Sequence, residues 1–195
     1  MNINETVLIT TKDKIKLFAR RLVLADREAL QQFGQSLSDE STALFLPHPY
    51  DDAIVDVLLK RSENGLDLTM GLFDKKKIVA YFFLWYYDNK VPLLGIGLHD
   101  TFQGKGIGQK ILKLLIDEAR RNGCDGIELT TLPNNQRAFS LYEKLGFQYY
   151  ADVENKVGDG RIVVEKAMFY PLKQGVSPSM KMHQPPICLS SQTGH

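Results

Sequence analysis

The sequence has little cysteine, and the few cysteines form no recognisable cluster. Cys124 and Cys188 are its only two, and neither belongs to a CxxC pair or to a Cys/His group with zinc spacing. This pattern excludes a disulfide-stapled scaffold, indicates no metal site, and is typical of a protein of the reducing cytoplasm.

Net charge and long apolar runs are also scarce. Lys and Arg number 24 against 23 Asp and Glu, so a formal charge of +1 provides no broad attraction for a polyanion, and we expect no nucleic-acid partner. The first residues lack the basic and apolar regions of a signal peptide. The longest apolar run, residues 78–87, is about half a membrane span. We therefore expect a cytoplasmic protein that neither is secreted nor enters a membrane.

The remaining composition is that of one soluble domain. A chain of 195 residues with 44% apolar residues can bury roughly 70% of its unfolded surface without a disulfide or a structural metal. We place the domain at residues 14–173, after a leader at 1–13. Proline, serine and glycine gather from Gln174 onward, which predicts a disordered tail at 174–195.

Hydrophobic periodicity and turn residues predict the order of the elements. Strands are expected at residues 14–20, 66–73, 78–87, 91–98, 126–132, 147–153 and 161–170, and helices from 26, from 38, and at 53–60, 107–121 and 135–145. The run 78–87 has too few polar residues to alternate, so we expect both of its faces to be covered. The fold class is therefore mixed α/β, with about seven strands, four to five helices, an antiparallel meander and one parallel pair around the long helix.

A turn with three alternating glycines precedes the long helix. Gly104, Gly106 and Gly108 leave backbone N–H groups uncovered, and the helix N-terminus adds partial positive charge, so the turn can hold phosphate oxygens. The dinucleotide fingerprint GxGxxG fails at Gln109, and no Gly-Lys pair continues into a P-loop. A tight structural turn is the alternative interpretation.

Two segments match known sequence patterns. The segment Gln103-Gly104-Lys105-Gly106-Ile107-Gly108 matches the pattern Gln/Arg-x-x-Gly-x-Gly/Ala. The segment from Asn135 to Phe147 matches the pattern Asn-x-x-Ala-x-x-Leu-Tyr-x-x-x-Gly-Phe at every fixed position. Together with the strand order, these segments resemble the GNAT family of N-acetyltransferases over about residues 14–170, and the tail lies outside the resemblance.

The resemblance implies a GNAT-like acyl-CoA N-acyltransferase fold, with acetyl-CoA bound between two splayed strands. The implied cofactor residues are Ile96, Gly97, Leu98, Gln103, Gly104, Lys105, Gly106, Ile107, Gly108, Asn135, Tyr142 and Lys144. The backbone N–H of Leu98 is the implied oxyanion donor, and Tyr142 is the implied general acid that protonates the departing thiolate.

No acidic residue occupies the strand at 91–98, where many relatives carry a glutamate that takes the proton of the amine. His48 is the preferred substitute because an imidazole titrates near neutral pH, and Glu128, Asp88 and Asp100 are alternatives. The aromatic and acidic residues Tyr50, Asp51, Asp52, Trp85, Tyr86 and Tyr87 could line a site for a cationic amine.

We therefore expect an acetyl-CoA-dependent enzyme that acetylates a primary amine of a small molecule, as a monomer or homodimer. Two alternatives stay open: a protein lysine or N-terminal acetyltransferase, and a non-catalytic acyl-CoA sensor. The acceptor, the acyl-chain length and the role of the tail are not decided by any motif.

Overall fold

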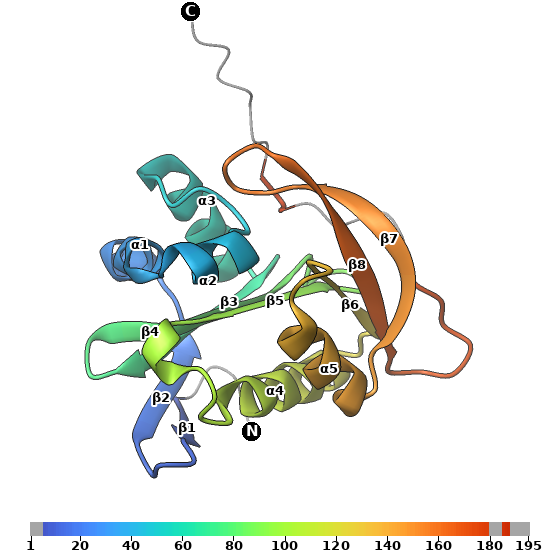
Figure 1. The fold of residues 1–195 in the computed structure, drawn as a ribbon, viewed down its shortest axis with the longest axis horizontal. Coiled ribbons are helices and arrows are strands. Elements are labelled where there is room, and N and C mark those ends of the chain that lie inside the picture. Colours follow the sequence, from blue (N-terminus) through green and yellow to red (C-terminus); the bar gives the residue numbers. More distant parts are fainter. Residues whose placement is uncertain (1–5, 180–184, 188–195) are drawn as a thin grey trace, which may run out of the picture.

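The computed structural model describes residues 6–179 and 185–187, and its centre is a mixed sheet (Figure 1). Within the described chain the strands are β1 (Val7–Thr10), β2 (Lys16–Arg21), β3 (Leu68–Asp74), β4 (Lys77–Trp85), β5 (Leu93–Leu98), β6 (Gly126–Thr131), β7 (Gln148–Lys156) and β8 (Ile162–Pro171). They lie in the order β1-β2-β3-β4-β5-β6-β8-β7, and β5 with β6 is the parallel pair. This confirms the predicted mixed class.

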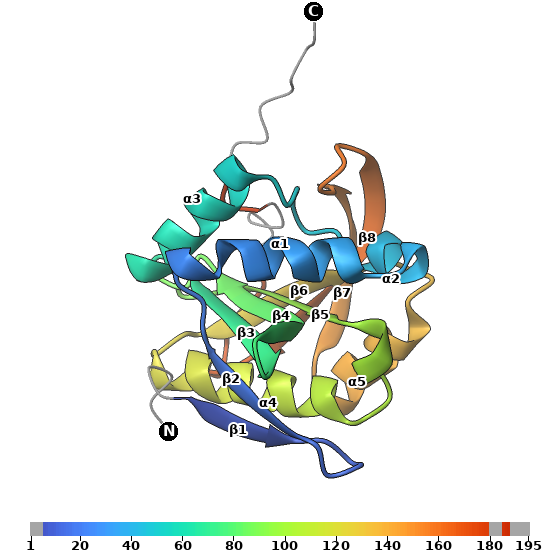
Figure 2. The same cartoon turned by 90° about the vertical axis from the view of Figure 1, so that its left-hand side faces the viewer.

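Helices cover both faces of the sheet. They are α1 (Arg27–Ser36), α2 (Asp39–Leu44), α3 (Asp52–Glu63), α4 (Ile107–Arg121) and α5 (Gln136–Leu145), with short 3₁₀ turns at Leu24–Asp26 and Asp100–Phe102. Helices α1, α2 and α3 lie on one face, and α4 and α5 lie on the other (Figures 1 and 2). Every residue of β4 from Ile78 to Trp85 is buried between the two layers, as predicted for that run.

The first strand corrects the leader predicted for residues 1–13. Val7 and Ile9 are buried and Leu8 is 48% exposed, so β1 is a half-buried strand that pairs antiparallel with β2. The described sheet consequently has eight strands where about seven were predicted. Four residues are too few for an alternating pattern to stand out from a polar terminus.

The long helix α4 starts and stops as its sequence predicts. Gly106 precedes it with a φ of 78°, and Ile107, Ile111, Leu115 and Ala119 form its buried stripe. A glycine supplies this left-handed conformation without the steric cost of a Cβ atom. The helix therefore packs along the sheet with its N-terminus at the glycine turn.

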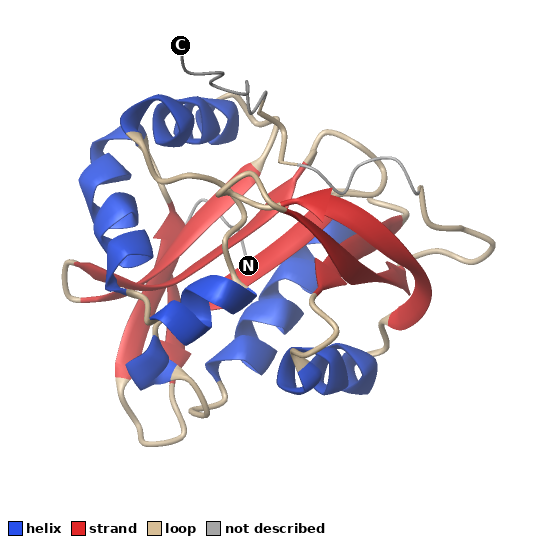
Figure 3. Ribbon diagram, turned by 45° about the horizontal axis from the view of Figure 1, so that its top comes forward, coloured by secondary structure: helices blue, strands red, loops and turns tan. Residues whose placement is uncertain are grey.

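The tip of the curved β7–β8 hairpin contacts the layer of helices formed by α1, α2 and α3 (Figure 3). Gly158 N–H donates to the carbonyl of Leu46 at 2.8 Å, in the loop between α2 and α3. A Cβ atom on Gly158 would lie 2.5 Å from the carbonyl carbon of His48, so this approach requires glycine. We call this contact the hairpin clasp.

Residues 180–184 and 188–195 of the predicted tail lie outside the described residues. The described parts of the tail lie against the domain. Ser179 donates to Glu128 from its backbone N–H and from its hydroxyl, the latter at 3.0 Å, and Ile187 packs beside the core under α1 and α3. Within the described residues, no helix has the length and apolar character needed to cross a membrane.

Gly158→Ala should lower the free energy of unfolding by about 1–3 kcal/mol, because backbone atoms of His48 cannot rotate away as a side chain could. Urea denaturation measures this. Gly108→Ala is the matched control, since its Cβ would meet Leu141 at an ordinary 3.4 Å. We expect the control to be as stable as the wild type or more stable. Equal stability of Gly158→Ala and the wild type would contradict the clasp.

Candidate active site

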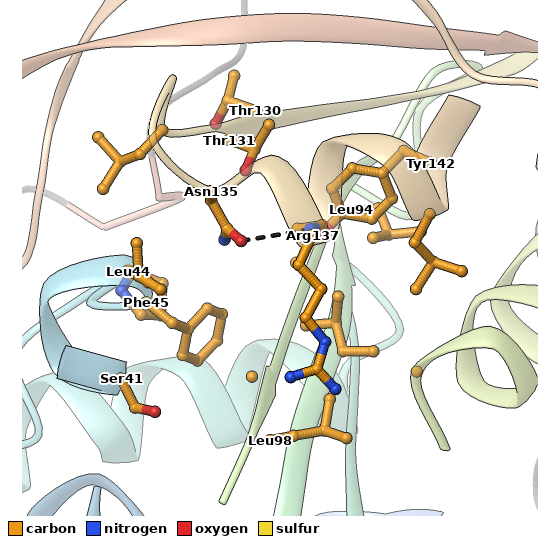
Figure 4. A pocket seen from close by; sticks show the side chains of 18 of the residues that line it. Ser41, Leu44, Phe45, Leu94, Leu98, Thr130, Thr131, Asn135, Arg137 and Tyr142 are labelled. Carbon is orange, nitrogen blue, oxygen red and sulfur yellow. Dashed lines mark hydrogen bonds between the residues drawn. The ribbon is translucent and has the colours of Figure 1, made fainter. Parts of the chain in front are cut away.

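The parallel strands β5 and β6 separate soon after they meet. They pair only at Leu93 with Glu128 and at Leu94 with Leu129, and beyond these pairs a cavity of about 930 Å³ opens between them. The cavity is bounded by the ends of both strands, the N-terminal turn of α4, helix α5, the loop after α2 and the β7–β8 hairpin (Figure 4). The splayed pair implied by the family resemblance is therefore present.

Beyond the last pair, β5 directs backbone groups into this gap. His99 N–H donates to Val79 on β4, whereas the carbonyl of Pro92 accepts from Glu128 on β6. Backbone groups of successive residues in a strand face opposite neighbours. Ile96 and Leu98 consequently face the side that β6 has left, and the N–H of Leu98 points into the gap. Gln103 Nε2 donates to the carbonyl of Leu98 at 3.3 Å.

The glycine turn forms the next wall of the cavity. Gly104 and Gly106 have φ values of 77° and 78°, and both line the cavity with Ile107 and Gly108. The turn provides no side-chain cap for α4, and the first turn of α4 contains no acidic residue. The N–H groups at the N-terminus of α4 therefore present a partial positive charge to the cavity.

Within the part of the chain that the structure describes, three basic side chains line the cavity around this turn. Arg137 and Lys144 come from α5, and Lys12 comes from the segment after β1. Lys144 was predicted, but Lys12 was missed because it fell in the assumed leader. The side chain of Lys105 points elsewhere: its Nζ forms an ion pair with Asp13 at 2.8 Å, and the residue does not line the cavity.

A polar network ties α2 to the glycine turn. Gln103 donates to the Ser41 hydroxyl at 2.9 Å and accepts from Arg137 at 3.4 Å. Asp100 accepts from the hydroxyls of Ser38 and Ser41, both at 2.6 Å, and from the Ser38 N–H. These hydrogen bonds hold the pKa of Asp100 well below its ordinary value, the Ser38 hydroxyl contributing most. Asp100 is thus a poor proton acceptor, contrary to its place among the candidate bases.

Helix α5 brings Tyr142 and Asn135 to the same cavity (Figure 4). Asn135 caps the helix, because its Oδ1 accepts from the Ala138 N–H at 3.3 Å. Tyr142 is 7% exposed. Burial raises the pKa of Tyr142 above its ordinary value, and the negative charge of Glu165 adds to this shift. Tyr142 therefore keeps its proton at neutral pH.

The geometry does not support His48 as the general base. Its side chain is fully buried and does not line the cavity. His48 Nδ1 lies 2.6 Å from the carbonyl of Pro49, which can only accept, so Nδ1 carries the proton. Nε2 then accepts from the Tyr81 hydroxyl at 3.1 Å. Both nitrogens are used, and burial lowers the pKa of His48 to about 4.

The other carboxylates considered from sequence also lie away from the cavity. Glu128 is buried and accepts from Ser179, and Asp88 is exposed on the loop after β4. Asp51 caps α3, and Asp52 accepts from Gln31. Of the six residues predicted for the amine site, Trp85 alone lines the cavity.

Among the described residues, the carboxylate that lines the cavity is Glu165 on β8, which is not one of the residues predicted from sequence. Asn155 on β7 donates to Glu165 at 2.5 Å and to Thr130 on β6 at 3.2 Å. A signal existed in the sequence, since Glu165 shares its face of the strand with Val163 and Ala167. A carboxylate on an otherwise apolar strand face needs an explanation. Within residues 6–179 and 185–187, no group of three or more His, Cys, Asp or Glu could hold a metal ion.

Comparison with known sequences finds a family and partial relatives. The profile described as the acetyltransferase (GNAT) family matches residues 30–147. The uncharacterized N-acetyltransferase YvbK of Bacillus subtilis (strain 168) is 30% identical over 62% of this chain and 75% of its own length. N-alpha-acetyltransferase 30 of Saccharomyces cerevisiae is 38% identical, but the match spans 27% of this chain and only 30% of the yeast protein.

Solved structures share the fold at low sequence identity. The GNAT domain of S. lividans PAT has a TM-score of 0.72 and 17% identity, covering 86% of this chain and 97% of that domain. The putative acetyltransferase yncA from Salmonella typhimurium, solved with acetyl-CoA, has a TM-score of 0.64 and 20% identity, covering 83% and 97%. At such identities the similarity establishes the fold alone.

The buried His48 makes stability depend on pH. Its folded pKa of about 4 lies below the ordinary 6.5, so the folded state binds fewer protons between these values. The contribution of the neutral His48 to the free energy of unfolding is therefore fully present above pH 6.5. This free energy should fall by about 3 kcal/mol as the pH drops to 4. Urea denaturation of the wild type and of His48→Asn across this pH range measures the effect. The part of the pH dependence of the free energy of unfolding that comes from His48 should be present in the wild type and absent from the variant.

His99→Gln is the control for this titration, because it removes a histidine but keeps His48. It should retain the wild-type slope. An NMR titration that places the His48 imidazole near its ordinary pKa would contradict the buried, doubly bonded ring.

Proposed function

We propose, on the premise that this chain belongs to the GNAT family of acetyltransferases, that it transfers an acetyl group from acetyl-CoA to a primary amine of a small molecule. The observation that carries the proposal is the gap between β5 and β6. It brings the backbone N–H of Leu98, the uncapped turn before α4 and the buried Tyr142 to one cavity.

The lining fits the co-substrate. A pyrophosphate suits the N–H groups of residues 104–108, because anions bind at uncapped helix N-termini. Lys12, Arg137 and Lys144 add positive charge around that turn. The backbone groups of Ile96, which face away from β4 toward the side that β6 has left, suit the amide groups of the pantetheine arm. Asn135 lines the same path, and its amide nitrogen is left for the arm while its oxygen caps α5.

Bound acetyl-CoA supplies a thioester whose acetyl carbon accepts the attack of the amine. An N–C bond forms and the C–S bond breaks. The N–H of Leu98 stabilises the negative charge that develops on the acetyl oxygen. Tyr142 gives its proton to the departing sulfur, and Glu165 takes the proton that the amine loses. Asn155 holds the Glu165 carboxylate in place for this step.

The hairpin clasp favours a small acceptor. Gly158 and Leu46 join the β7–β8 hairpin to the loop after α2. These two segments together bridge the cavity at the end away from the glycine turn. A folded protein surface would have to open this contact to deliver a lysine. Because Tyr142 and Glu165 both line the cavity, the lining also favours catalysis over a non-catalytic acyl-CoA sensor.

Tyr142→Phe and Glu165→Gln test the assigned roles. Release of the CoA thiol should fall by about 10²–10⁴-fold in each, while the acetyl-CoA Kd stays unchanged. Free amine becomes abundant as the pH approaches about 10, so high pH should rescue Glu165→Gln but not Tyr142→Phe.

Tyr149→Phe is the matched control, because Tyr149 is 47% exposed on β7 and does not line the cavity. It should keep the wild-type rate. Full activity of Tyr142→Phe would remove the general-acid assignment, and the lack of any high-pH rescue in Glu165→Gln would remove the assignment of the base.

A further inference from the structure

In the described part of the chain, more basic than acidic side chains line the cavity. Among the described residues, the lining contains a single carboxylate, Glu165. Its basic side chains are Lys12, Arg137 and Lys144 around the glycine turn and Lys156 and Arg161 on the β7–β8 hairpin. The first three face the proposed phosphate site. The last two need another explanation, since they lie at the acceptor end beside the hairpin clasp.

The hairpin presents Arg161 and Glu165 on one face. Residues of a strand alternate between its two faces, so Val163 and Glu165 of β8 share a side, and Arg161 immediately precedes that strand. Ile162 and Val164 occupy the opposite face and are 71% and 50% exposed. Arg161 and Glu165 both line the cavity, in agreement with this alternation.

Neighbouring side chains hold Glu165 at the inner end of this face. Asn155, which is 4% exposed, donates to Glu165 and to Thr130 and so fixes the carboxylate against β6. Glu165 and the proposed general acid Tyr142 line the same cavity, and the negative charge of Glu165 adds to the raised pKa of Tyr142. An amine that reaches Glu165 is therefore close to the reacting groups.

Arg161 stands at the outer end with part of its guanidinium unused. Its Nε donates to Asp159 at 2.7 Å, and its backbone N–H donates to the same carboxylate at 3.1 Å. The two terminal nitrogens have no hydrogen-bond partner within the described part of the chain, and Lys156 forms no ion pair there. A terminal pair of guanidinium N–H groups matches a carboxylate.

The spacing of these two ends limits the acceptor. Arg161 and Glu165 are four residues apart, which is about 13 Å along a strand before the side chains reach toward each other. The amine and the anion of one acceptor must then be several bonds apart. An α-amino acid, whose two groups are attached to one carbon, is too short to meet both.

We propose that the acceptor is an ω-amino carboxylate: a primary amine received at Glu165 and, several carbons away, a carboxylate received by Arg161 and Lys156. The inference rests on the proposed function and narrows its substrate class. Phe45, Leu46 and Val163 line the cavity and suit the methylene chain between the two groups. A polyamine is disfavoured, since its second ammonium group would meet two cations.

Three amines with the same six-carbon chain test the proposal: 6-aminohexanoate, hexylamine and 1,6-diaminohexane. Their far ends are negative, neutral and positive. With the full chain and acetyl-CoA, kcat/KM should be highest for 6-aminohexanoate, lower for hexylamine by at least about tenfold, and lowest for the diamine. Glycine should be a poorer acceptor than 6-aminohexanoate.

Arg161→Gln should remove most of the preference for 6-aminohexanoate over hexylamine, because it should lower kcat/KM for 6-aminohexanoate far more than kcat/KM for hexylamine. Arg120→Gln is the matched control, since Arg120 is also an exposed arginine paired with a nearby aspartate, Asp117, but lies on α4. It should keep the full preference.

Turnover with the diamine preferred, or a preference untouched by Arg161→Gln, would overturn the inference and leave the acetyltransferase proposal standing. Acetyl-CoA binding with no turnover of any of these amines would overturn the small-amine function itself, and this inference with it.

Discussion

The separation of β5 from β6 is the constraint on which the rest of the structure depends. Two parallel strands that stayed paired along their whole length would satisfy the backbone groups between them. Here the pairing ends at Leu94 and Leu129, so backbone groups of Ile96 and Leu98 face a cavity. Gly97 belongs to this arrangement. A Cβ atom there would lie 2.3 Å from the ring of Phe45, so glycine allows the chain after α2 to lie directly on β5.

Two contacts far apart in sequence keep the separated strands in place. On the cofactor side, Gln103 and Asp100 bind Ser41 and so join the turn after β5 to α2. On the acceptor side, Gly158 binds Leu46 and joins the β7–β8 hairpin to the chain that follows α2. The same short segment, α2 and its following loop, thus holds both ends of the cavity, and the cofactor and acceptor ends are expected to respond together when it moves.

Local features of the site could be predicted from sequence, and features that depend on packing could not. Spacing alone located the glycine turn, and a second spacing located Asn135 and Tyr142 on one helix face. His48 was misjudged because its burial against Tyr81 joins residues 33 positions apart. Glu165 was missed because no short motif shows that β8 pairs with β6 and so brings Glu165 to the cavity. The order of the strands along the chain was predictable because each strand except β1 carried its own pattern.

The central claim is that the gap between β5 and β6 holds acetyl-CoA. A crystal structure of the full chain grown with acetyl-CoA tests it most directly. The account predicts the pyrophosphate on backbone N–H groups of residues 104–108, the pantetheine arm hydrogen-bonded to Ile96, and the acetyl oxygen at the N–H of Leu98. Acetyl-CoA bound outside this gap, or no binding at saturating concentration, would contradict the account.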